Sequence, residues 1–274
     1  MYVGVDVGGT KTLLAVLNEH GEIVEQKKLP TPKTYANFLL ELKHAVSQLE
    51  TKDFKAGSVA IPGRIDRKHG RGIVLSNLSW KNFNIQHDAE NIFKCPIAIE
   101  NDTKLAGLSE AMLIKDKYSR IAYVTISTGI GYTLVVDSKL DVNVGDTGGR
   151  AIQLEHKGKI MAWEDFASGR AIVERYGKMA KDIDDPAIWH QISRELAQGF
   201  IHLIAILEPE VIVIGGSVGE YFDKYADFLS KEITRYKLPM VVTPDLRQAQ
   251  RPEEAVIYGC YDYAKQVYGH AKSN

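Results

Sequence analysis

The sequence predicts an α/β protein built from two related halves. Apolar runs with strand character alternate with segments of helical periodicity along the 274 residues. A hairpin plan also occurs twice, first in VGVDVGGTKTLLAVLNEHG and again in YVTISTGIGYTLVVDSKL. Each copy has an apolar strand, a tip rich in threonine and glycine, a second apolar strand and a polar turn. A single hairpin of this kind is common because glycine turns a strand at little cost, but two copies with the same tip chemistry indicate a duplication.

The first half opens with three strands, a helix and a fourth strand. Strands are expected at Tyr2–Val7, Thr12–Leu17 and Ile23–Lys28, with a glycine pair at the first tip. The run ANFLLELKHAVSQLE has apolar residues at helical spacing, and SVAIPG then gives a short buried strand that stops at its proline and glycine.

A further strand then meets a helix at two polar residues. The run CPIAIEND is expected to form the strand, and TKLAGLSEAMLI continues from it with helical periodicity. Asn101 and Asp102 therefore lie at the carboxyl end of a strand. Open α/β sheets usually bind their ligands at that edge.

The final third is mainly helical. The runs WEDFASGRAIVERYGKMA and PAIWHQISRELAQGFIHLIAILEP both have helical spacing, and the second is expected to end at Glu208, before Pro209. An apolar strand at Val211–Ile214 then runs into a third strand-to-glycine junction. The run EEAVIYGCYDYAKQVYG predicts a closing helix in which Gly259 allows close packing.

The composition predicts a soluble globular protein and excludes several classes of function. Hydrophobic residues make up 45% of the chain, and 34 basic and 35 acidic residues leave a net charge of −1. No basic face for nucleic acid or acidic tail is evident. Only Cys95 and Cys260 are present, which excludes a disulfide scaffold and a thiolate zinc site. No run approaches the roughly 20 apolar residues that cross a bilayer, so we expect a cytoplasmic protein without a membrane or nucleic-acid partner.

The three glycine junctions suit the phosphates of a nucleoside triphosphate. Backbone amides at the two hairpin tips can donate to phosphate oxygens, and Asp6 can hold a hydrated magnesium ion. Phosphoryl transfer also needs a carboxylate that takes the proton of the acceptor, and Asp102 is the candidate. Capping of the following helix is the alternative role for Asp102.

Seven motifs in series carry a family resemblance. They are GVDVGGTKT, IPGRID, LSNLSW, ENDTKLAGLSEA, STGIG, EDFASGRAI and IVIGGSVG. In this order and at these spacings they resemble the ROK family of sugar kinases and repressors over essentially the whole chain. The resemblance implies the two-lobed actin-like, hexokinase-like ATPase fold, with ribonuclease H-like lobes whose mixed sheets are flanked by helices. It implies an N-terminal lobe at residues 1–116, completed by the closing helix at 255–274, and a C-terminal lobe at 117–254, with ATP and sugar in the cleft.

The resemblance also implies roles for matching residues. It makes Asp102 the general base and Asp6 the residue that holds Mg²⁺ through water. The sugar contacts that it implies are Asn77, Asn101, Asp102, Asp146 and Glu164. The ATP contacts that it implies are Asp6, Gly8, Gly9, Thr10 and Lys11, then Thr128, Gly129 and Gly131, then Gly215, Gly216 and Ser217 near the adenosine. A homodimer is usual among similar proteins and is expected here.

The chain departs from the family pattern in the loop VGDTGGRA. Its glycines suggest a phosphate cradle, but it lacks the Lys-Ser/Thr pair of a P-loop, and the resemblance instead makes it face the sugar. Asp146 stands where the family has Glu, and Gly149 stands where it has a sugar-binding His that can also ligate zinc. Because the family's cysteine cluster is missing as well, we expect no zinc site, with Glu155 and His156 on the surface.

Two consequences of this departure stay open. Loss of the imidazole leaves either a gap for water or room for a substituent on the sugar. Arg150 either fills the vacancy, which favours an acidic or phosphorylated acceptor, or is simply solvated. Glu164 likewise is either a sugar contact or an exposed carboxylate in the first turn of a helix.

The expected activity is ATP- and magnesium-dependent phosphorylation of a hexose or modified hexose. A polyphosphate-dependent sugar kinase is one alternative, because phosphate-binding loops do not name the donor. A non-catalytic sensor of sugar or nucleotide is another. Repression is disfavoured, since the sequence starts at the first hairpin and leaves no room for a helix-turn-helix. The sequence names neither the sugar nor the hydroxyl that is phosphorylated.

Overall fold

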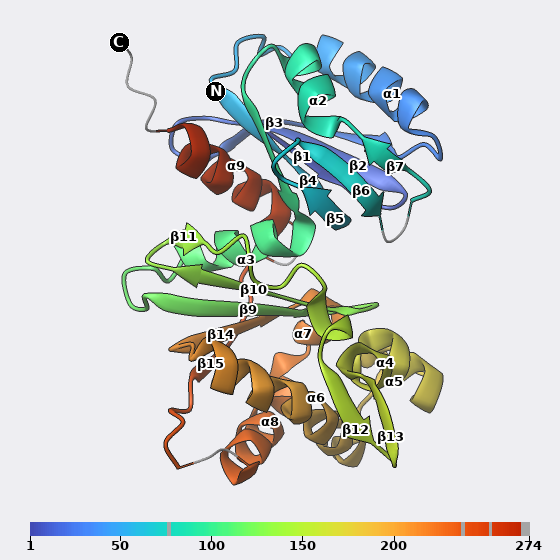
Figure 1. Cartoon of the computed structure of the whole chain (residues 1–274), viewed down its shortest axis with the longest axis vertical. Coiled ribbons are helices and arrows are strands. Elements are labelled where there is room, and N and C mark those ends of the chain that lie inside the picture. The colour runs from blue at the N-terminus through green and yellow to red at the C-terminus, as the bar shows by residue number, and fades with distance from the viewer. Residues whose placement is uncertain (76–77, 237–238, 252–253, 270–274) are drawn as a thin grey trace. The chain divides into compact units, whose positions relative to one another are not determined.

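The computed structural model describes residues 1–75, 78–236, 239–251 and 254–269, which form two compact units. The first unit comprises Met1–Ser109 with Glu253–Asn274, and the second comprises Glu110–Pro252. Figure 1 labels the elements of both units. None of the helices in the described residues is long and apolar enough to cross a lipid bilayer.

The first unit is organised around a five-stranded mixed sheet with the strand order β3-β2-β1-β4-β8. Its strands are β1 (Tyr2–Val7), β2 (Lys11–Leu17), β3 (Ile23–Pro30), β4 (Ala56–Ile61) and β8 (Ile97–Asn101). The first three strands are antiparallel neighbours, whereas β4 and β8 run parallel to β1. Val3, Val5 and Val7 are all fully buried, so β1 forms the centre of this core.

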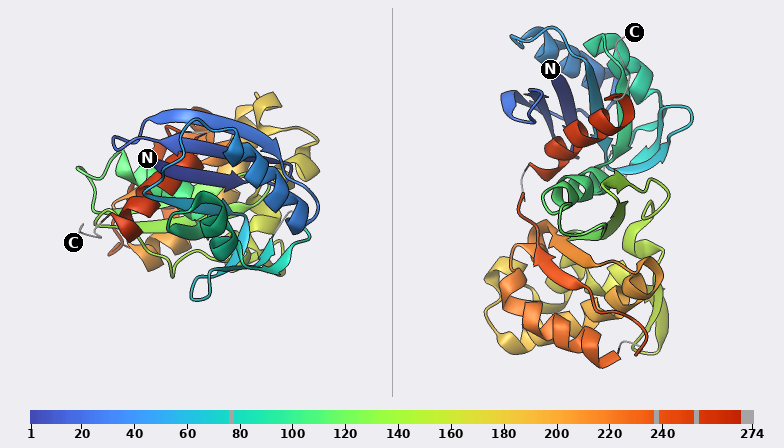
Figure 2. Two further views of the ribbon diagram at one scale, coloured as in Figure 1. Left: turned by 90° about the horizontal axis from the view of Figure 1, so that it is seen from above. Right: turned by 90° about the vertical axis from the view of Figure 1, so that its left-hand side faces the viewer.

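Helices cover both faces of this sheet (Figures 1 and 2). They are α1 (Tyr35–Ser47) and α2 (Ile85–Phe93) on one face and α9 (Ala255–Tyr268) on the other. The helix α1 buries Phe38 and Leu42 among the strand residues, and α9 packs Ile257 against Tyr2. A small antiparallel sheet is formed by β5 (Gly63–Asp66), β6 (Arg71–Leu75) and β7 (Lys81–Phe83).

The predicted close packing of the closing helix is confirmed at Gly259. A Cβ atom at this position would lie 1.9 Å from the carbonyl oxygen of Leu105. Leu105 belongs to α3 (Asp102–Met112), which follows β8 directly. Only glycine therefore allows α9 to approach α3 this closely.

The second unit repeats the sheet of the first. Its strand order is β11-β10-β9-β14-β15, again with antiparallel neighbours followed by parallel ones. These strands are β9 (Arg120–Ile126), β10 (Ile130–Val136), β11 (Lys139–Leu140), β14 (Val211–Gly215) and β15 (Asp245–Gln248). Because β1 and β2 correspond to β9 and β10 in this order, the duplicated hairpin plan seen in the sequence is confirmed.

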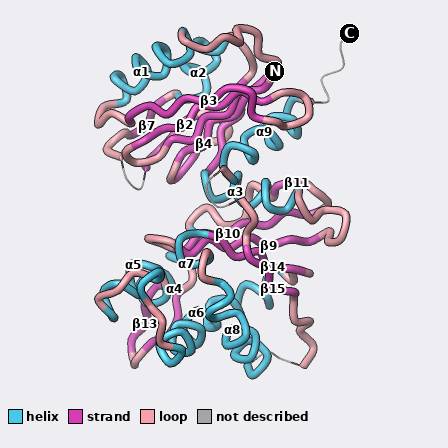
Figure 3. The backbone as a smooth tube through the Cα atoms, turned by 180° about the vertical axis from the view of Figure 1, so that it is seen from behind, coloured by secondary structure: helices cyan, strands magenta, loops and turns pink. Residues whose placement is uncertain are grey.

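Two long helices pack against this second sheet, as Figure 3 shows from behind. They are α6 (Pro186–Leu207) and α8 (Phe222–Tyr236), and they bury Phe200 and Leu229 in one core with Val124 and Ile212 of the sheet. The predicted end of α6 is confirmed, because Glu208 caps it in the left-handed conformation. The remaining elements of this unit are a hairpin of β12 (Gln153–His156) and β13 (Lys159–Ala162), α4 (Trp163–Ala167), α5 (Gly169–Tyr176) and α7 (Gly216–Gly219), with 3₁₀ turns at Gly148–Arg150 and Ala180–Asp182.

One helical prediction is corrected in this unit. The run WEDFASGRAIVERYGKMA was expected to be helical throughout, but it forms two short helices that meet at Ser168. Ser168 has extended backbone angles, and its Oγ accepts a hydrogen bond from the amide of Ala171 at 3.3 Å. Serine is a favoured N-cap, so it ends one helix and begins the next. Gly177 then ends the second helix in the left-handed conformation.

Candidate active site

The tip of the first hairpin offers two open backbone donors. The amide of Gly8 does not contribute to them, because it donates to the carbonyl of Lys11 at 3.0 Å and closes the turn. The Gly8 amide is therefore engaged within the turn, and the ATP contact predicted for Gly8 stays a prediction. The amides of Gly9 and Thr10 donate to no group in the described part of the chain, and Thr10 and Lys11 are exposed. Open amides at a glycine turn are suited to phosphate oxygens.

Two carboxyl groups with raised pKa values are Asp6, near the end of β1, and Asp102, at the start of α3. Burial and the nearby charge of Asp102 raise the pKa of Asp6 to about 7. Burial raises the pKa of Asp102 to about 6, although a hydrogen bond from the Thr103 amide opposes this shift. Within the described residues, no lysine or arginine forms an ion pair with Asp6. A cation or a proton would therefore stabilise this pair of carboxyl groups.

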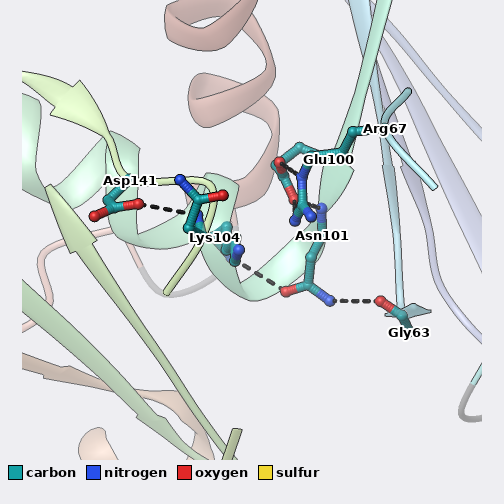
Figure 4. Close-up of polar contacts among 7 residues, drawn as sticks. Gly63, Arg67, Glu100, Asn101, Lys104 and Asp141 are labelled. Carbon is teal, nitrogen blue, oxygen red and sulfur yellow. Dashed lines mark hydrogen bonds and ion pairs between the residues drawn. The ribbon is translucent and has the colours of Figure 1, made fainter. Parts of the chain in front are cut away.

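Asn101 takes the capping role that was the alternative for Asp102 (Figure 4). Its side-chain oxygen accepts from the amide of Lys104 at 3.3 Å, which is the usual N-cap interaction. Its side-chain nitrogen donates to the carbonyl of Gly63 at 3.3 Å. The Asp102 carboxylate accepts from the adjacent Thr103, through its amide at 2.7 Å and its side chain, and from its own backbone amide. Capping therefore does not occupy Asp102.

A buried ion pair precedes Asn101, and sequence reasoning missed it. Glu100 on β8 is fully buried, and its two oxygens accept from Nε and Nη2 of Arg67 at 2.7 Å each. The same carboxylate accepts from the amide of Asn101 at 2.7 Å. Figure 4 shows the guanidinium facing the carboxylate. The pair fixes the backbone at the point where β8 passes into Asn101 and Asp102.

The tip of the second hairpin has the same open donors as the first. Ser127 bonds across the turn to the carbonyl of Gly129 at 2.8 Å, and the amide of Gly169 donates to Ser127 at 2.7 Å. The amides of Thr128 and Gly129 donate to no group in the parts of the chain that the structure describes. Gly131 follows in β10, paired with Thr125. The second unit therefore provides a second candidate phosphate cradle.

Glu164 lies directly against this second tip. Only 7% of the residue is exposed, so the alternative of an exposed helix carboxylate is wrong. Its Oε2 accepts from the amide of Ile130 at 2.9 Å, and its Oε1 accepts from Nε of Arg150 at 2.8 Å. Nη2 of Arg170 is 3.7 Å from the same Oε1. A Cβ on Gly129 would lie 2.4 Å from the carboxylate, so glycine at the tip allows this approach.

Gly149 packs closely against β10. This glycine is buried, and a Cβ on it would lie 2.9 Å from Cβ of Ile130 and 3.4 Å from Cβ of Glu164. A side chain at this position would therefore require Ile130 to shift, while the expected gap or room beside the sugar stays a prediction. Arg150, which follows it, pairs with Glu164 rather than being only solvated.

The third glycine junction joins β14 to α7. Gly216 has φ of +81°, and a Cβ on it would lie 2.5 Å from the carbonyl oxygen of Ile126. Gly215 is buried beside Thr125 of β9, whereas Ser217 is exposed. This turn is therefore packed against the base of the second hairpin, in the same unit as Thr128 and Gly129.

The described structure does not bring two of the predicted sugar residues to the hairpin tips or to Asp102 and Glu164. Asp146 is exposed and lines a separate cavity of about 350 Å³ with Tyr132 and His202. Asn77 lies outside the described residues. A larger cavity of about 710 Å³, between β12, α6 and α8, contains none of the predicted site residues.

The expected surface position of two loop residues is borne out only for Glu155. Glu155 is exposed, whereas His156 is half-buried and stacks on Phe166 with ring centroids 4.2 Å apart. No group of three or more His, Cys, Asp or Glu side chains in the described ranges is arranged to hold a metal ion.

Comparison with solved structures defines the class of fold. A glucokinase of the ROK family from Streptomyces griseus, solved in complex with glucose and AMPPNP, matches with a TM-score of 0.78. The match covers 97% of this chain and 99% of that chain at 22% identity. The duplicated mixed sheets flanked by helices are thus those of the actin-like ATPase fold, as expected.

The family follows from the sequence comparisons. The model of the ROK family matches residues 2–267, and the chain therefore belongs to the ROK family. A glucokinase from Streptomyces coelicolor is 24% identical over 96% of this chain and 97% of its own length. An N-acetyl-D-glucosamine kinase from Haemophilus influenzae is 25% identical over 94% and 97%, respectively. The family and the enzyme class predicted from the seven motifs, a carbohydrate kinase, are confirmed.

Proposed function

We propose that this chain transfers the γ-phosphoryl group of ATP to a hydroxyl of a hexose or modified hexose, with Asp102 as general base. The observation that carries the proposal is the raised pKa of Asp102. Asp102 lies at the start of α3, where Asn101 forms the N-cap contact, and burial raises the pKa of Asp102 to about 6. A base with a pKa near the working pH is ionised and still has affinity for a proton.

In the proposed step, the sugar hydroxyl gives its proton to the Asp102 carboxylate while its oxygen bonds to the γ-phosphorus. The bond from the γ-phosphorus to the bridging oxygen breaks, and ADP leaves. Asp102 holds the proton until it passes to solvent. Positioning and charge stabilisation supply most of the catalysis of such a transfer.

The cofactor assignment rests on the donors and acids that the described chain leaves open. The amides of Gly9 and Thr10 in one unit, and of Thr128 and Gly129 in the other, would bind phosphate oxygens. Asp6 would hold Mg²⁺ through water, since a cation stabilises the ionised carboxylate against the burial and the nearby charge of Asp102 that raise its pKa to about 7. When bound, Mg²⁺ neutralises part of the charge on the phosphates.

The sugar contacts are assigned to Asn101, Asp102, Asp146 and Glu164, together with Asn77. Asn101 keeps one free N–H and one free lone pair after its bonds to Gly63 and Lys104, so it can still meet a hydroxyl. The named kinases among the relatives act on glucose and on N-acetyl-D-glucosamine, so a hexose or modified hexose is the class that we propose.

A coupled assay of ADP release over a panel of sugars tests the proposal. The expected result is turnover that requires both ATP and Mg²⁺ and that is lost in Asp102→Ala. Turnover with polyphosphate but not with ATP would show that polyphosphate is the phosphoryl donor. Binding of sugar and nucleotide without any turnover would contradict the kinase and favour a non-catalytic sensor.

A further inference from the structure

The cluster around Glu164 bears on which sugars the site accepts. Glu164 is the carboxylate that we assign to the sugar, yet both of its oxygens already accept hydrogen bonds. One bond comes from the Ile130 amide and the other from Arg150, with the Arg170 guanidinium close to the second oxygen. Each oxygen keeps acceptor capacity for a sugar hydroxyl, but the charge of the carboxylate is already paired with the Arg150 guanidinium.

Arg150 and Arg170, in contrast, have N–H groups that make no hydrogen bond among the described residues. A guanidinium has five N–H groups, and Arg150 uses one of them, on Glu164. Arg170 makes its single ion pair at 3.7 Å and donates no hydrogen bond within the described part of the chain. Their side chains are 69% and 44% exposed, so both present unused donors to solvent.

These guanidinium groups are also held in place. Glu164 is buried and bonded to the backbone of β10, so it pins Nε of Arg150 beside the second hairpin tip. Asp165, the next acidic residue, forms no ion pair with either arginine among the described residues. With Nε of Arg150 held by Glu164, the two terminal nitrogens carry the remaining N–H groups, and this pair of nitrogens can bind a carboxylate or phosphate in a bidentate way.

The residue before Arg150 presents no side chain of its own. A Cβ on Gly149 would lie 2.9 Å from Cβ of Ile130, so the backbone packs directly against β10 at this position. The polar group that this loop presents beside Glu164 is therefore the Arg150 guanidinium.

From this geometry we infer that the acceptor is a sugar carrying an anionic group, a carboxylate or a phosphate, which Arg150 and Arg170 bind. The inference rests on the proposed function, because it takes Glu164 as part of the sugar site. The shared chemistry of the two groups is an anion with several oxygen acceptors. Arg150 and Arg170 thereby become the residues that determine specificity.

A substrate panel separates the two kinds of anion from neutral sugars. We would compare D-glucuronate and D-glucose 6-phosphate with D-glucose, using ATP and Mg²⁺. At least one anionic sugar is expected to have kcat/KM above that of D-glucose by about 10-fold or more, since charge-assisted bonds are about twice as strong as neutral ones. The KM for that sugar is expected to rise with ionic strength, whereas that for D-glucose is not.

Single substitutions locate the effect. Arg150→Gln and Arg170→Gln are each expected to lower kcat/KM for the anionic sugar by about 10- to 100-fold, mostly through KM. The loss for D-glucose is expected to be smaller, because D-glucose loses only the indirect effect on Glu164. Both arginines are largely exposed, so neither variant should unfold the chain. Arg194→Gln is the matched control, because Arg194 is exposed on α6, far along the chain from the cluster, and loses the same charge.

The possible outcomes distinguish this inference from the proposed function. Turnover of D-glucose at least as efficient as that of both anionic sugars overturns the inference and leaves the kinase standing. An equal loss for anionic and neutral sugars in the two variants does the same. If no sugar is phosphorylated, calorimetric titration with the same three sugars decides the inference alone: tighter binding of an anionic sugar that Arg150→Gln abolishes supports it, and equal or absent binding overturns it.

Discussion

At the scale of single residues, the central feature is a half-buried carboxyl group, Asp102, with which no cation pairs among the residues that the structure describes. Asp102 lies in the first turn of α3, yet the capping contact belongs to Asn101. The position therefore leaves an acid free that local sequence patterns alone would have assigned to the helix. Asp6 lies close enough for the charge of Asp102 to raise its pKa. Two such groups titrate as a pair, so their observable pKa values belong to both.

The proposed base predicts an acidic limb in the pH profile. Burial raises the pKa of Asp102 to about 6 and that of Asp6 to about 7. Because a general base works only when ionised, kcat/KM should rise as the pH increases through this range and fall about tenfold per unit below it. Kinetics of ADP release between pH 5 and 9 would measure the limb.

Two variants test the assignment of that limb. Asp102→Ala should reduce turnover to background at every pH while leaving the affinity for nucleotide nearly unchanged. Asp116→Asn is the control, since Asp116 is exposed and outside the site. Full turnover in Asp102→Ala, or an unaltered limb at reduced rate, would contradict the role of base.

At the scale of elements, the buried pair of Arg67 and Glu100 ties the turn after β5 to the end of β8. Two bonds of 2.7 Å from one guanidinium satisfy a carboxylate that is fully buried. Removal of the cation would leave that carboxylate uncompensated. The same carboxylate accepts from the amide of Asn101, so the disturbance would reach the start of α3.

We predict that Arg67→Met lowers the free energy of unfolding by about 3 to 5 kcal/mol, the usual cost of breaking a buried ion pair on one side. The double variant Arg67→Met/Glu100→Gln should recover part of this loss, because neither position of the pair then carries a charge. Urea unfolding of both variants would measure it. Arg64→Met serves as the control on β5, since Arg64 is exposed. A loss equal to that of the control would mean that the pair contributes nothing to stability.

Sequence patterns predicted these elements well and their long-range pairings poorly. Both hairpins, the junction of β8 with α3 and the glycine in α9 were predictable, because apolar periodicity and glycine act within a few residues. The bond between Arg67 and Glu100 joins residues 33 positions apart, and no local pattern marks it. The burial of Glu164 was not predictable for the same reason, because its contacts come from Ile130 and Arg150 in other elements. The break at Ser168 had a local signal, a serine N-cap before a glycine, which helical periodicity on both sides concealed.

At the scale of the whole molecule, the chain consists of one sheet plan used twice. The order of the five strands is the same in both units, and each hairpin tip has two consecutive amides that donate to no group within the described ranges. In the first unit the tip follows Asp6, and in the second it lies against Glu164. The two tips thus share a backbone geometry but lie beside different acidic residues. The proposed base, Asp102, belongs to the first unit alone.

The open amides predict that nucleotide stabilises the folded protein. A non-hydrolysable ATP analogue with Mg²⁺ should raise the free energy of unfolding of the unsubstituted protein by about 2.7 kcal/mol at 100 times its dissociation constant from that protein. The same concentration is then used for every variant. Unfolding followed at increasing ligand concentration would measure this gain. Asp102→Ala should keep the full gain, because we assign Asp102 to the proton and not to the phosphates. Asp6→Asn should lose most of it, since Asp6 is the group that we assign to the magnesium ion. An equal gain in the presence of a chelator, or in Asp6→Asn, would show that the nucleotide binds without the metal and would contradict this assignment.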